Sequence, residues 1–190
     1  MKAYTVSDKE KLGNVVVYIA NHVPDLSKTK LLKLLYFMEE YSVKRFHTPF
    51  LGLLFEVWQA GPVVKDVFID LSETPVLLDG FVKKEVKDGN TYISAIKEFC
   101  DDEFSDNDIV VMDDMLKKYG NMTAKQLVNL THAKGSLWYK VAEQEHLLEA
   151  FKEGKLNNSS YEIDFSEELP KCAREFYKEQ VDFLKLTREC

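Results

Sequence analysis

The chain has 190 residues, of which 45% are hydrophobic and 30% are charged, and its formal net charge at pH 7 is −7. This length fits one domain with or without a modest extension, and the apolar content argues against a disordered chain. The acidic balance makes nucleic acid an unlikely class of partner, because phosphate backbones are bound by clustered Lys and Arg.

Two helices are predicted in the first quarter of the chain. Residues 7–10, Ser-Asp-Lys-Glu, have the form of a capping box, and apolar residues recur behind them at helical spacing. We therefore expect a helix over about 8–21, ended by Pro24. Ser27 predicts the N-cap of a second helix over 28–46. Its apolar residues cover most of its circumference, so we expect it at the centre of the core.

A strand and a third helix are predicted next. Residues 51–58 are rich in β-forming side chains and lie between Pro49 and Gly61-Pro62, which predicts a strand. Proline at the first position of a helix loses no intrahelical hydrogen bond. Gly61-Pro62 therefore predicts the entry to a helix over 63–71.

A β-hairpin is predicted over residues 81–96. The segments 81–86 and 91–96 flank Asp88-Gly89, a dipeptide that favours a hairpin turn. An isolated two-stranded ribbon is marginally stable in water. We therefore expect the hairpin to pair with the 51–58 strand or to lie across a helix.

The stretch 98–108 is strongly acidic. A calcium loop would explain the carboxylates, but their spacing does not match that pattern and no glycine supplies its central turn. Ser105 followed by acidic residues instead predicts the start of a fourth helix, where carboxylates lie favourably at the positive end of the dipole. Gly120 is expected to end this helix.

Three further helices complete the predicted set. Thr123 predicts the cap of a short fifth helix, and Ser136 that of a sixth helix over about 137–153. The polar stretch 157–160 is the best linker in the chain. A last helix is expected over 167–187, with its apolar residues along one side.

These elements predict a mainly α (α+β) fold. We expect a compact domain of about six or seven helices with a small antiparallel hairpin or three-stranded β element. Residues 1–156 form this domain in our prediction, and residues 157–190 form a C-terminal extension whose one helix packs on it. Homo-oligomer formation stays open at this point.

Targeting and redox signals point to the cytoplasm. The N-terminus lacks the apolar core of a signal peptide, and the apolar runs fall short of the ~20 residues that a membrane helix needs. The three widely spaced cysteines, Cys100, Cys172 and Cys190, suggest neither a disulfide framework nor a zinc site. We expect a reduced cytoplasmic protein without a membrane anchor, a metal or a cofactor.

The sequence lacks the common catalytic motifs. It has no nucleophile elbow, no phosphate-binding glycine loop and no His-Glu-x-x-His, and its four histidines are scattered. His132 at a helix end could act as a general base, but a structural bond to backbone carbonyls is the simpler interpretation. We expect no enzymatic activity; the alternative is an unrecognised enzyme with a site near Glu56, Asp66 and His132.

Three segments share motifs with a known family. Residues 30–37, Lys-Leu-Leu-Lys-Leu-Leu-Tyr-Phe, resemble the Lys-Leu-x-Lys-Leu-Leu-Tyr-Phe signature of the Panacea (SocA-like) antitoxins. Residues 55–64, with Trp58 and Gly61-Pro62-Val63, are similar to the Ala-Trp-x-x-Gly-Pro-Val block of that family. Tyr119-Gly120, then 127–132 ending in Thr131-His132, and finally Trp138 follow in the family's order.

The resemblance implies a protein-binding function. Panacea antitoxins are encoded beside unrelated toxins, often in prophages, and neutralise them by direct binding, while SocA-type members are thought to deliver a toxin to a cellular protease. The expected function is that of an antitoxin with a cognate toxin as partner. The alternatives are a protease adaptor or a phage-associated scaffold protein.

The motif residues are expected to be mainly structural, because large aromatic side chains dominate protein cores. The partner-binding surface should then lie on exposed faces, with the predicted 167–187 helix either adding a contact element or packing back on the domain. The motif residues are Leu34, Leu35, Tyr36, Phe37, Trp58, Gly61, Pro62, Val63, Thr131, His132 and Trp138.

Overall fold

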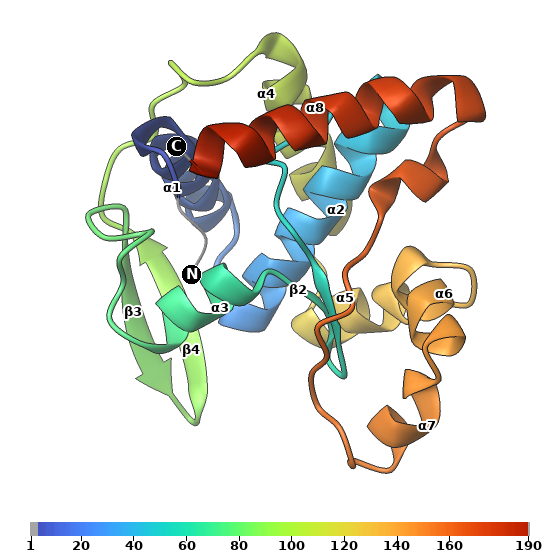
Figure 1. Ribbon diagram of the computed structural model, residues 1–190. Coiled ribbons are helices and arrows are strands. Elements are labelled where there is room, and N and C mark those ends of the chain that lie inside the picture. The colour runs from blue at the N-terminus through green and yellow to red at the C-terminus, as the bar shows by residue number, and fades with distance from the viewer. Residues whose placement is uncertain (1–3, 190) are drawn as a thin grey trace.

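The structure is a computed structural model, and it describes residues 4–189. Helices dominate and the strands are short, so the predicted mainly α class is confirmed (Figure 1). The elements in chain order are α1 (Val6–His22), α2 (Lys28–Phe46), β1 (Glu56–Trp58), β2 (Gly61–Val63), α3 (Lys65–Ser72), β3 (Val82–Lys87), β4 (Asn90–Ala95), α4 (Asp106–Tyr119), α5 (Ala124–Thr131), α6 (Leu137–Gln144), α7 (Leu147–Lys152), the 3-10 helix η1 (Phe165–Glu168) and α8 (Lys171–Glu189).

Helix α2 is the centre of the molecule, as its apolar circumference predicts. Ser27 caps it, and its body contacts α3, α4, α5, β2, β4 and η1. The fully buried Tyr36 ring on α2 lies in a cluster with Phe55 and Phe165, at centroid distances of 5.5 and 5.6 Å. This aromatic cluster joins the centre of α2 to the segment that precedes α8.

The β residues form two separate antiparallel pairs. β1 pairs with β2, and β3 pairs with β4 around the predicted Asp88-Gly89 turn. Within residues 4–189 the β3–β4 hairpin does not join β1; it lies against α1, and the Ile93 amide donates to the Leu26 carbonyl. The second of the two predicted placements, across a helix, is therefore the one observed.

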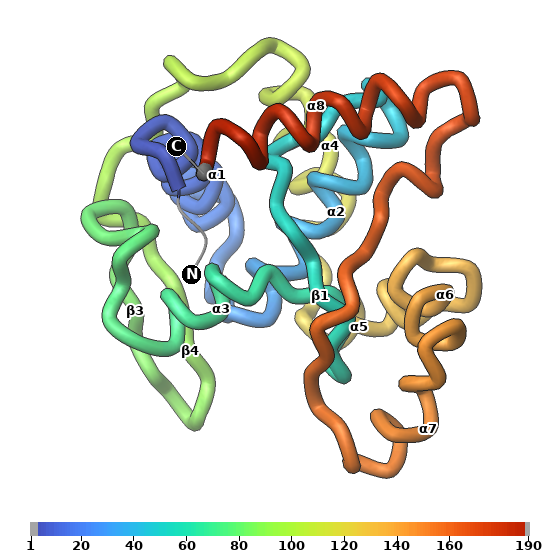
Figure 2. The backbone as a smooth tube through the Cα atoms, in the orientation of Figure 1, coloured from blue at the N-terminus to red at the C-terminus, as the bar shows by residue number. Residues whose placement is uncertain are grey.

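The free edge of β1 is covered by the chain after α7. The Val57 amide donates to the Tyr161 carbonyl, and the Ile163 amide donates to the Phe55 carbonyl. Figure 2 shows residues 157–163 running alongside β1 before the chain turns into η1 and α8. The polar stretch that was predicted as a linker is itself bonded to the hairpin: the Gln59 amide donates to the Asn157 carbonyl, and the Ser159 hydroxyl donates to the Val57 carbonyl.

The strand and the helix predicted around β1 and β2 are both present, but their predicted starts are wrong. The expected strand over 51–58 is reduced to Glu56–Trp58. The amides of residues 50–52 donate to the Glu39 carboxylate and are therefore not available for strand pairing. The expected helix over 63–71 begins only at Lys65, because Gly61–Val63 pairs with β1.

Three helix boundaries also differ from prediction. The capping box of α1 consists of Thr5 and Asp8, so this helix begins earlier than expected. The predicted helix over 137–153 is divided into α6 and α7, because His146 adopts a left-handed conformation with φ 57°. The last helix begins at Lys171 rather than 167, after the separate η1 turn.

The caps of α4, α5 and α6 are the residues that the sequence predicts: Ser105, Thr123 and Ser136. Asp108 completes a capping box with Ser105, which explains one of the acidic residues at the start of α4. No helix among residues 4–189 is long and apolar enough to cross a membrane.

Candidate functional site

Motif residues from three distant segments converge on the turn between β1 and β2. Trp58 pairs with Gly61, so the exposed residues Gln59 and Ala60 form the tip of this hairpin. Gly61 has φ 92°, and a Cβ atom there would lie 2.6 Å from Thr131 Oγ1. Both the backbone conformation and the close approach require glycine at this position.

Lys33 binds the second strand of the hairpin from the side of α2. It projects from α2, its side chain is buried, and its Nζ donates to the Pro62 carbonyl at 2.8 Å. Burial lowers the pKa of Lys33 to about 7. This lysine belongs to the 30–37 motif but was not predicted to be buried, although its place on a helix that is apolar on nearly all sides is a signal that could have identified it.

His132 and Trp138 hold the first strand and the tip. His132 Nε2 lies 3.0 Å from the Gln59 carbonyl oxygen, and its Nδ1 lies 2.7 Å from the Val128 carbonyl oxygen. Trp138 Nε1 donates to the Trp58 carbonyl at 2.9 Å, and its ring packs on His132 with a centroid distance of 3.8 Å. Together with Lys33 these side chains bind three carbonyl groups around the turn, and we call this set the hairpin clamp.

The remaining motif residues lie close to this clamp or in the core. Thr131 is buried, and its hydroxyl donates to the Val128 carbonyl at 2.8 Å. Trp58 packs edge-on against the Phe68 ring of α3 at 4.9 Å. The buried members of the whole motif set are Leu34, Leu35, Tyr36, Phe37, Gly61, Pro62, Val63, Thr131 and Trp138.

Glu56, Asp66 and His132, the residues of the alternative enzyme site, each contact a different group. The Glu56 carboxylate accepts from Trp58 Nε1 at 2.8 Å, and both ring nitrogens of His132 face backbone carbonyls. Asp66 lies beside Tyr4, where burial first and the Asp66 carboxylate second raise the pKa of the phenol. These contacts give Glu56 and His132 roles in positioning the chain, which is what the simpler interpretation of His132 predicts.

Replacing Trp138 with phenylalanine tests the clamp. The ring contact with His132 would remain, but the Trp58 carbonyl would lose its indole donor, so the free energy of unfolding should fall by about 1–2 kcal/mol. Urea denaturation measures the change. The Tyr161→Phe variant, which alters a ring that is 45% exposed, should change it by less than about 0.5 kcal/mol. Equal stabilities of the two variants would show that the indole bond does not support the hairpin.

Comparison with known proteins identifies one match. The sequence model of the family described as antitoxin SocA-like, Panacea domain, matches residues 31–139. The matched region runs from α2 into α6 and includes every residue of the hairpin clamp. No curated protein and no solved structure matches the chain.

Proposed function

The chain belongs to the SocA-like antitoxin family with a Panacea domain, and we propose from this that it is an antitoxin that neutralises a cognate toxin by direct binding. The observation that carries the proposal is the family match, which covers more than half of the chain. Members of an antitoxin family act on another protein, so a protein partner is the general expectation.

The geometry of the hairpin clamp supports binding rather than catalysis. Lys33, His132 and Trp138 lie around the β1–β2 turn, and the polar atoms of all three contact main-chain carbonyl groups. Their chemistry is used to hold the scaffold in shape. We propose that the protein is not an enzyme and that it acts in the cytoplasm through its outer surface.

Co-expression with the product of the adjacent gene tests this function. The neighbour alone should arrest growth, and growth should return when this protein is expressed with it. The two proteins should then co-purify, because neutralisation by binding requires a stable complex. The amount of neighbour protein should stay constant, whereas a protease adaptor would lower it.

Two results would contradict the proposal for this pair. The adjacent product could be harmless when it is expressed alone, or it could stay lethal when this protein is abundant. The suitable control is a chain carrying Gly61→Val, which should not form the β1–β2 turn because of the positive φ and the 2.6 Å approach to Thr131 Oγ1. It should fail to restore growth.

A further inference from the structure

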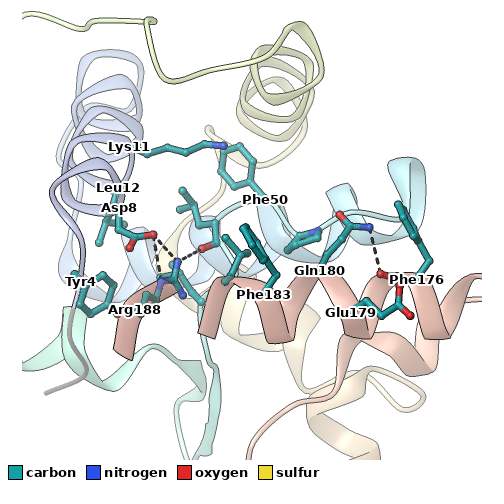
Figure 3. Close-up of a pocket in the computed structure, with 14 residues that line it drawn as sticks. Tyr4, Asp8, Lys11, Leu12, Phe50, Phe176, Glu179, Gln180, Phe183 and Arg188 are labelled. Carbon is teal, nitrogen blue, oxygen red and sulfur yellow. Dashed lines mark hydrogen bonds and ion pairs between the residues drawn. The ribbon is translucent and has the colours of Figure 1, made fainter. Parts of the chain in front are cut away.

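An apolar groove lies between α8 and the start of α1. It has a volume of about 460 Å³, within the range of pockets that hold ligand or side-chain groups. Its floor comes from the segment before β1, and α8 forms one wall (Figure 3). Its apolar lining includes Leu12, Phe50, Leu51, Leu53, Phe176 and Phe183.

Helix α8 leaves its large apolar side chains exposed along this groove. Phe176 is 60% exposed and Phe183 is 66% exposed, and both line the groove. Their spacing of seven residues places them on one side of the helix, two turns apart. The neighbouring Tyr177 is instead buried, so α8 packs on the protein through a different side. Exposed aromatic rings that border an apolar pocket mark a site of interaction with another molecule.

An acidic loop, residues 98–108, adjoins the groove at Lys11, although none of its residues lines the groove. The 98–108 loop is attached to α1 through two contacts: the Ser7 hydroxyl donates to Glu103 at 2.7 Å, and Lys11 forms an ion pair with Asp108 at 3.1 Å. Figure 3 shows this loop beyond Lys11, on the side away from α8. Asp101 and Asp102 on the loop are exposed to solvent.

The basic residues at the groove are already paired. Lys11 is bound to Asp108, and Arg188 lies 2.9 Å from Asp8. Lys178 and Lys185 of α8 line the opposite flank of this helix, together with Glu162 and Asp164. The α8 wall of the groove instead carries Glu179, which is exposed. The groove is therefore apolar at its floor and lined by two acidic and two basic residues, and the excess negative charge beside it comes from the adjoining 98–108 loop.

We infer that this groove binds a helical segment of the partner protein whose apolar face is flanked by Lys and Arg. Helices bind grooves by inserting side chains from successive turns, and the exposed Glu179 together with the adjoining acidic loop complements basic flanks. A second copy of this chain is disfavoured, since it would bring the same acidic loop and a net charge of −7 to the contact. The inference rests on the proposed function in identifying that partner as the toxin.

A designed peptide provides a direct test. The probe is a fluorescent 18-residue amphipathic helix of Leu and Lys, and the matched probe has Glu in place of every Lys. Fluorescence anisotropy should show binding of the Lys peptide and about tenfold or weaker binding of the Glu peptide. The double variant Phe176→Ser/Phe183→Ser should weaken binding of the Lys peptide about tenfold or more, because two anchors are lost. The double variant should keep the thermal stability of the wild type, since both phenylalanine rings are exposed.

Two matched variants control for nonspecific effects. Val86→Ser changes an apolar residue that is 71% exposed on β3, away from the groove, and should not alter binding. The double variant Asp101→Asn/Asp102→Asn should bind the Lys peptide more weakly, and its affinity should depend less on salt concentration. The control double variant Glu85→Gln/Asp88→Asn on the β3–β4 hairpin should change neither quantity.

Three outcomes would overturn the inference. The two peptides could bind equally well, or the Phe176→Ser/Phe183→Ser variant (the phenylalanine variant) could bind the Lys peptide as the wild type does. Sedimentation could also show that the wild type is a dimer and that the phenylalanine variant is a monomer. The co-expression assay separates this failure from failure of the antitoxin function. If the phenylalanine variant neutralises the toxin as well as the wild type does, only the groove is excluded. If the wild type binds the Lys peptide but does not neutralise the adjacent product, only the antitoxin function is excluded.

Discussion

The Glu39→Ala variant should lose about 3–5 kcal/mol of unfolding free energy, because three backbone amides lose their acceptor and each buried unpaired donor costs about 1–3 kcal/mol. Glu39 lies on α2 with 1% of its surface exposed. Its carboxylate accepts from the amides of Phe50, Leu51 and Gly52 at 3.0, 3.0 and 3.2 Å. In the alanine variant these amides lose their acceptor inside the protein, where water does not replace it.

The same segment is held from its other side by Arg188. The guanidinium donates to the carbonyls of Leu51 and Gly52, each at 2.8 Å, and this contact fixes the end of α8. We therefore expect Glu39→Ala to loosen α8 as well. Hydrogen exchange should become faster at residues 171–189 in this variant, in addition to the lower urea midpoint.

An exposed glutamate provides the control for Glu39. Glu143→Ala on α6 should change the free energy of unfolding by less than about 0.5 kcal/mol, because its side chain is exposed to solvent. Glu39→Gln should lose much of the stability too, since an amide replaces one of the two acceptor oxygens with a donor. A loss below about 1 kcal/mol in Glu39→Ala would show that this carboxylate does not hold the segment.

Local signals predicted the elements whose defining contacts are local. The N-caps Ser27 and Ser105 each accept from an amide three residues ahead, so sequence spacing alone reveals them. The Asp88-Gly89 turn is likewise contained within four residues. Burial of α2 followed from its composition, because a helix that is apolar on nearly all sides must be covered.

The elements that prediction missed depend on distant residues. Glu39 acts on amides 11 to 13 residues away, and Lys33 acts on a carbonyl 29 residues away. The apolar helix around them is a sign of burial, but the sequence does not reveal their partners, because these lie far along the chain. Gly61-Pro62 gives the same local signal for a helix start as for a strand in a tight hairpin, and pairing with β1 decides between them.

The candidate site was predictable in its residues but not in its contacts. The motifs identified Trp58, His132 and Trp138, yet the bonds from His132 and Trp138 span 73 and 80 residues to the turn. For α8 the sequence showed an apolar stripe but not its orientation. The structure buries Tyr177 and leaves Phe176 exposed, a difference that only the path of the chain after η1 determines.

Replacing Lys33 with methionine should flatten the dependence of stability on pH. The pKa of Lys33 in the folded protein is lowered from 10.5 to about 7 by burial, whereas the unfolded chain retains the ordinary value. Between these two values the unfolded state binds more protons than the folded state. The free energy of unfolding of the wild type should therefore rise with pH across this window, by up to ~1.4 kcal/mol per pH unit.

Denaturant titrations of both proteins at pH 6, 7, 8 and 9 measure this effect. The stability of the wild type relative to Lys33→Met should be lowest at pH 6, where the folded protein must hold a buried ammonium, and should increase by about 2 kcal/mol or more by pH 9. Lys125→Met on the exposed side of α5 should follow the wild-type curve. Parallel curves for the wild type and Lys33→Met would mean that the buried amine keeps its proton, with the Pro62 carbonyl and its surroundings stabilising the charge.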